Sequence, residues 1–168
     1  MIAAIQELRD NAPVAFVPLV LALLLFVING ARLTWIDART HLLPNRIILP
    51  WYVFALVLLG AALLLAGDGA GLLRTFLGGA ILFSFYLLLH MVQPRGMGLG
   101  DVKLAGIMGL YLGYLSWSHL LWSTVATFLL GGLASLVFII LRRAGLKTSL
   151  AFGPYLVIGT LAALFVAG

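Results

Sequence analysis

Two aspartates stand out in an otherwise apolar chain: Asp37, within TWIDARTHLLPN, and Asp101, within RGMGLGDVKL. Each lies at the end of a long apolar stretch, where a carboxylate is costly to keep and therefore suggests a function. Two carboxylates held together in a low-dielectric cleft cannot both ionise easily, so they share one proton. The ionised member could take a proton from a water that attacks a peptide carbonyl, while the protonated member donates to the carbonyl oxygen. Such a pair could hydrolyse peptide bonds without an acyl-enzyme.

Other catalytic chemistries find little support in the residue types of the chain. The sequence contains no cysteine, which excludes thiolate catalysis, disulfides and cysteine-ligated zinc. No serine, histidine and acid grouping is apparent by spacing. The three histidines, which include no pair at i and i+4, are His41, His90 and His119. We therefore expect no metal and no cofactor.

The composition places the chain in a lipid bilayer. Of its 168 residues, 64% are hydrophobic and 9% are charged, and the mean hydropathy is +1.19. These values are incompatible with a soluble domain of this length. The ten basic residues lie scattered between apolar runs instead of forming a stripe, so nucleic acid is not an expected partner.

The charges, prolines and glycine-rich turns divide the chain into six apolar stretches. Each is close to the roughly 20 residues that cross a bilayer as a helix. We expect residues 1–168 to form one integral-membrane domain, an all-α bundle of six transmembrane helices, preceded by a short surface helix in the first twelve residues. The expected spans lie near 14–36, 47–66, 72–93, 97–117, 119–141 and 149–167.

The basic residues predict an orientation, because lysine and arginine near span ends remain on the cytoplasmic side. Arg9 and Arg74 fall on one set of span boundaries. The alternate set carries Arg32, Arg39, Arg46, Arg95, Lys103, Arg142, Arg143 and Lys147. We therefore expect both termini outside, and both aspartates at the cytoplasmic face of the inner (cytoplasmic) membrane.

The backbone around each aspartate has its own turn signals. The fourth span is too short unless it begins near Met97, which would put Asp101 just inside the interface. Gly98 and Gly100 would permit irregular backbone at that depth. On the other side of the site, Pro44 and Asn45 are expected to form the turn after Asp37 and to start the next helix.

Small residues follow Asp101 at helical spacing. Ala105, Gly109 and Gly113 fall on the same face as Asp101. This face could be a groove that receives an extended or helical substrate. For the glycines alone, a small-xxx-small surface that packs against another helix is the more usual explanation.

These segments resemble the prepilin peptidases of type IV pilus, secretion and archaellum systems, which are GxGD aspartyl proteases. Residues 98–101 reproduce the GxGD element inside a longer GMGLGDVKL, and Asp37 is followed by an LPN resembling the family's IPN. A lone GxGD would be weak evidence, but both elements in the expected order are specific. The resemblance covers roughly residues 34–113.

The resemblance implies an aspartic endopeptidase with Asp37 and Asp101 as its catalytic pair. Its expected partners are prepilin-like precursors, cut at the cytoplasmic side between a short basic leader and an apolar helix. Longer family members carry a cytoplasmic insertion with paired cysteines, associated with zinc and with methylation of the new amino terminus. This chain has no cysteine, so it resembles a short form with the peptidase alone.

Two alternatives remain open at this level. A small polytopic transporter or channel component could use paired acids to bind a proton or cation, although such acids usually lie near the midplane. An intramembrane protease of the presenilin type shares the GxGD, but would need its first aspartate deeper in a helix than an LPN turn allows. The residues do not indicate an oligomeric state.

Overall fold

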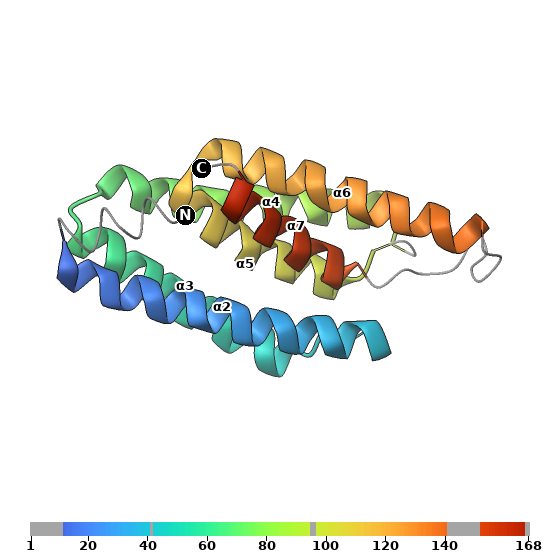
Figure 1. Cartoon of the computed structure of the whole chain (residues 1–168), viewed down its shortest axis with the longest axis horizontal. Helices are drawn as coiled ribbons and strands as arrows, with labels where there is room; N and C mark the ends of the chain where they lie inside the picture. The colour runs from blue at the N-terminus through green and yellow to red at the C-terminus, as the bar shows by residue number, and fades with distance from the viewer. Residues whose placement is uncertain (1–11, 41, 95–96, 141–151, 167–168) are drawn as a thin grey trace.

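The computed structural model describes residues 12–40, 42–94, 97–140 and 152–166 (Figure 1). The expected N-terminal surface helix lies almost wholly outside these residues, as do Arg9, Arg95 and the basic residues of segment 141–151. The described residues form helices joined by short connections, with no strand among them. The helices are α2 (Pro13–Thr40), α3 (Asn45–Leu65), α4 (Gly69–Val92), α5 (Leu99–Leu115), α6 (Trp117–Ile140) and α7 (Gly153–Val166).

The helix ends follow from local turn chemistry. Gly67, at φ 72°, ends α3 in a left-handed conformation, and its N–H and that of Asp68 donate to the carbonyls of Leu64 and Leu63. Asp68 then caps α4, because its Oδ1 accepts a hydrogen bond of 2.7 Å from the Gly71 N–H. This turn falls between the spans expected near 47–66 and 72–93, and α3 begins at Asn45, directly after Pro44, as predicted.

Helix α5 forms the centre of the bundle. It packs against α3, α4, α6 and α7, and Figure 1 shows it enclosed between the α2–α3 pair and α6. The Tyr111 hydroxyl accepts a bond of 3.1 Å from Trp51 Nε1 of α3 and donates a bond of 2.9 Å to the Ala22 carbonyl of α2. Hydrogen bonds in a low-dielectric interior are strong, so this link fixes α5 relative to the α2–α3 pair.

The outer surface of the bundle is apolar. Large hydrophobic side chains are exposed on the long helices, for example Leu24, Phe54, Phe76 and Leu121. A surface of this kind is suited to lipid and not to water. The prediction of an all-α polytopic membrane protein is confirmed.

The lengths of the helices qualify the six-span prediction. By length and composition, α2, α3, α4 and α6 can each cross a membrane. Helix α5 has 17 residues and α7 has 14, about 26 Å and 21 Å at 1.5 Å per residue, against a hydrocarbon core of about 30 Å. The two shorter helices therefore do not reach the lengths expected for the spans near 97–117 and 149–167, and the number of crossings stays a prediction.

Candidate active site

The first aspartate lies near the end of α2 and faces the start of α7. Asp37 is 3% exposed, and its Oδ2 accepts a hydrogen bond of 3.0 Å from the backbone N–H of Gly153. A Cβ on Gly153 would lie only 2.6 Å from that oxygen, so the approach requires glycine. Gly153 is the first residue of α7, and the N-terminus of a helix stabilises negative charge.

The second aspartate lies in the first turn of α5. Asp101 is 7% exposed, and its Oδ2 accepts a hydrogen bond of 3.1 Å from the Gly98 N–H, which is half of a capping box. Its Oδ1 is buried and has no hydrogen-bond partner among the described residues. A buried carboxylate oxygen without a partner is unusual in a folded protein and marks a place for a water, a proton or a substrate group.

The bundle brings the two aspartates to the same end. The charge of Asp37 acts on Asp101, so the carboxylates lie within electrostatic range of each other. Helix α7 packs against both α2 and α5, and in Figure 1 the end of α2 and the starts of α5 and α7 lie at the same end of the bundle. Two buried carboxylates that influence each other are harder to ionise together than either would be alone.

The turn after Asp37 is joined to the start of α5. Asn45 Oδ1 accepts a bond of 3.0 Å from Lys103 Nζ, and the Tyr52 hydroxyl donates a bond of 2.6 Å to the Lys103 carbonyl. Leu43 packs against Gly100, where an added Cβ would lie 2.7 Å from the Leu43 Cβ. The LPN and GxGD segments therefore hold each other in place.

The face of α5 predicted as a substrate groove is occupied in the structure. Gly109 and Gly113 are buried against α4, and a Cβ on Gly113 would lie 2.6 Å from the Arg74 carbonyl oxygen. Ala105 is also fully buried. The glycines thus make a close helix–helix contact, and a substrate could use this face only by displacing α4.

Two residues at the site carry no recognisable signature in the sequence. Gly153 belongs to a Gly-Pro pair, which indicates a helix start but not a contact with Asp37. Tyr86 of α4 is 1% exposed, and its hydroxyl lies near the Thr127 side chain of α6 and within electrostatic range of Asp101. Its ring also packs against Phe152, with centroids 6.2 Å apart, next to the start of α7.

The fold and the site define a multi-pass membrane protein with two buried carboxylates at one end of its bundle. The profile of the type IV leader peptidase family matches residues 19–140. The chain belongs to this family.

Individual relatives agree with the family assignment. The chain is 32% identical over 138 residues to a prepilin leader peptidase/N-methyltransferase of Pseudomonas aeruginosa, with 82% of the chain and 46% of the relative covered. It is 33% identical over 141 residues to a protein of the same name from Aeromonas hydrophila, with 82% and 47% covered. For one from Escherichia coli the values are 30% over 152 residues, with 87% and 64% covered. The chain spans about half the length of the first two relatives, and no solved structure matches it.

Proposed function

We propose that the chain is a membrane aspartic endopeptidase that removes the leader from type IV prepilin-like precursors. Asp37 and Asp101 are its catalytic pair. The observation that carries the proposal is the buried Oδ1 of Asp101, which has no hydrogen-bond partner in the described part of the chain. The same carboxylate lies within electrostatic range of Asp37. Family membership supports the same activity.

The reaction is the addition of water across a peptide bond. The ionised carboxylate accepts a proton from a water whose oxygen attacks the carbonyl carbon, while the protonated carboxylate donates its proton to the carbonyl oxygen. The resulting diol collapses as the C–N bond breaks and the amine takes a proton from the first carboxylate. The diol returns its other proton to the second carboxylate, which restores the starting state. No acyl-enzyme forms.

The neighbouring groups have supporting roles. The Gly98 and Gly153 N–H groups each hold one oxygen of a carboxylate, and on Asp101 the Oδ1 remains available for water or substrate. Pro44, Asn45 and Gly100 keep the two segments together. Only the peptidase activity is proposed for this chain, whose sequence contains no cysteine.

The proposed site lies at the cytoplasmic face of the inner membrane, and both termini lie on the opposite side of that membrane. Among the described basic residues, Arg32, Arg39, Arg46 and Lys103 belong to the end of the bundle that carries the aspartates. Arg74 belongs to the opposite end, where it donates bonds of 2.7 and 2.9 Å to the carbonyls of Gly113 and Tyr114. Basic residues favour the cytoplasmic side.

The proposal is tested by reconstituting the chain with a prepilin-like precursor and following the products by intact mass. Wild type should cut between the leader and the apolar helix. Asp37→Asn and Asp101→Asn should each lower the rate by about 10²-fold or more, because each removes one participant in proton transfer.

Asp68→Asn is the matched control. Asp68 is an aspartate at the opposite end of the bundle, and asparagine is an equally good helix cap, so this variant should cleave like wild type. Undiminished cleavage by either dyad variant would refute the proposal.

A further inference from the structure

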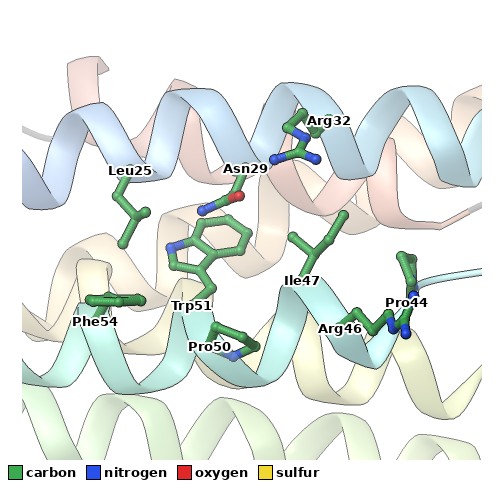
Figure 2. Close-up of a pocket in the computed structure, with 9 residues that line it drawn as sticks. All are labelled: Leu25, Asn29, Arg32, Pro44, Arg46, Ile47, Pro50, Trp51 and Phe54. Carbon is green, nitrogen blue, oxygen red and sulfur yellow. The ribbon is translucent and has the colours of Figure 1, made fainter.

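A second site is indicated by a groove between α2 and α3, on the outer side of this helix pair (Figure 2). The groove has a volume of about 550 Å³, and its lining includes two arginines but no acidic residue. It is separate from the α2 face that carries Asp37, which packs towards α7. The catalytic pair therefore does not account for this groove.

The groove is polar at one end and apolar at the other. Figure 2 shows Arg32 and Arg46 at the end close to Pro44, whereas Leu25 and Phe54 lie at the other end, towards the middle of the bundle. Both arginines are exposed, on α2 and α3 respectively. The lining is thus polar where a phospholipid headgroup would lie and apolar where its acyl chain would lie.

A buried amide faces the same groove. Asn29 is 8% exposed and lines the groove beside Trp51, where Figure 2 shows it between the two helices. No described residue makes a hydrogen bond with its side chain, although Trp51 donates its own N–H to Tyr111. Its amide is open to the groove, so it is available to hydrogen-bond with a polar group of a ligand there.

We propose that this groove binds one anionic phospholipid of the phosphatidylglycerol type. The Arg32 and Arg46 guanidinium groups hold the phosphate, since arginine binds phosphate in a bidentate manner. Asn29 donates to an ester oxygen of the glycerol, and an acyl chain lies over Trp51 towards Leu25 and Phe54. Basic pockets between membrane helices suit such headgroups, whereas two arginines without an acid would repel a basic peptide.

The test compares lipid retention by the full chain in mixed-lipid nanodiscs, measured by native mass spectrometry. Wild type should retain phosphatidylglycerol in preference to phosphatidylcholine. The double variant R32Q/R46Q should bind phosphatidylglycerol about tenfold more weakly or worse, because charged hydrogen bonds to the phosphate are lost. Asn29→Ala should weaken binding to a smaller extent.

Arg39→Gln is the matched control, since Arg39 belongs to the same end of α2 but stacks on Trp35, 4.0 Å from the ring centroid, outside the groove. It should bind lipid like wild type. Equal losses of phosphatidylglycerol binding in R39Q and R32Q/R46Q would mean that the lipid responds to diffuse surface charge, which would overturn the proposal. A wild type that does not prefer phosphatidylglycerol would overturn it as well.

A second measurement needs no variant and so does not depend on how well the variants fold. A photoreactive phosphatidylglycerol should cross-link wild type within residues 25–32 and 44–54. Cross-links confined to other helices would overturn the assignment. The assignment would also be overturned if an apolar helical peptide bound in this groove and phosphatidylglycerol could not displace it. The groove would then belong to a protein partner.

Discussion

At the residue scale, each aspartate is held by a backbone N–H at the start of a helix. Asp101 accepts from Gly98 at the start of its own helix, and Asp37 accepts from Gly153 at the start of α7. Each bond uses one oxygen of a buried carboxylate. The orientation of both side chains therefore depends on where α5 and α7 begin.

Gly153→Ala tests the contact that holds Asp37. The added Cβ would lie 2.6 Å from the Asp37 Oδ2, so the carboxylate must move away while the backbone donor remains. A misplaced catalytic group is costly, since displacements of about 1 Å can cost 10²-fold in rate. We expect cleavage of the precursor to fall at least about tenfold, measured as kcat/KM in vesicles.

Gly132→Ala provides the comparison for this variant. Gly132 is exposed in α6, and a Cβ there has no neighbour within 4 Å. Alanine should keep full activity and raise helix stability by up to about 1 kcal/mol. Wild-type kcat/KM in Gly153→Ala would mean that the Gly153 contact does not position Asp37.

At the element scale, the contact between α4 and α5 depends on glycines in both helices. A Cβ on Gly109 would overlap the Gly78 carbonyl oxygen, and a Cβ on Gly78 would lie 2.6 Å from the Gly109 carbonyl oxygen. The two backbones therefore touch, as in small-xxx-small packing of membrane helices. This contact fixes the depth and rotation of the helix that carries Asp101.

Gly109→Ala should separate these helices. Because the clash is with backbone and not with a flexible side chain, we expect a loss of about 1–3 kcal/mol in the free energy of unfolding. Unfolding of the purified protein in mild detergent measures the change, again with Gly132→Ala as the control. A stability equal to or above that of Gly132→Ala would contradict the packing described for α4 and α5.

At the scale of the whole molecule, the described lysines and arginines gather at the end of the bundle with the catalytic aspartates, and only Arg74 among them lies at the other end. This asymmetry predicts that the end with the aspartates faces the cytoplasm. The sequence has no cysteine, so single cysteines can report the orientation without a background.

Thr40 and Ser118 are suitable positions for this measurement. Both are exposed, Thr40 at the end of α2 near Asp37 and Ser118 at the opposite end of the bundle, at the start of α6. In intact cells, a membrane-impermeant maleimide should label Ser118→Cys but reach Thr40→Cys only after permeabilisation. The reverse pattern would contradict the proposed orientation.

Much of this architecture could be predicted from the sequence because local signals dominate it. The turn at Gly67, the helix start after Pro44 and the family assignment all follow from short segments. The contact between Gly153 and Asp37 could not be predicted, since it joins residues 116 positions apart and a Gly-Pro pair has no specific partner. The small residues after Asp101 permitted either a groove or helix packing, and only the partner glycines of α4 distinguish the two.

The most direct test of the central idea is whether Asp37 and Asp101 act as one unit. We would measure residual kcat/KM for Asp37→Asn, Asp101→Asn and the double variant in the same vesicles. When two groups act together in one step, removing both lowers kcat/KM little more than removing one of them. We predict that kcat/KM of the double variant lies within about threefold of that of the less active single variant, as expected for strongly non-additive effects. Losses that multiply, or a single variant that cleaves like wild type, would contradict the shared dyad.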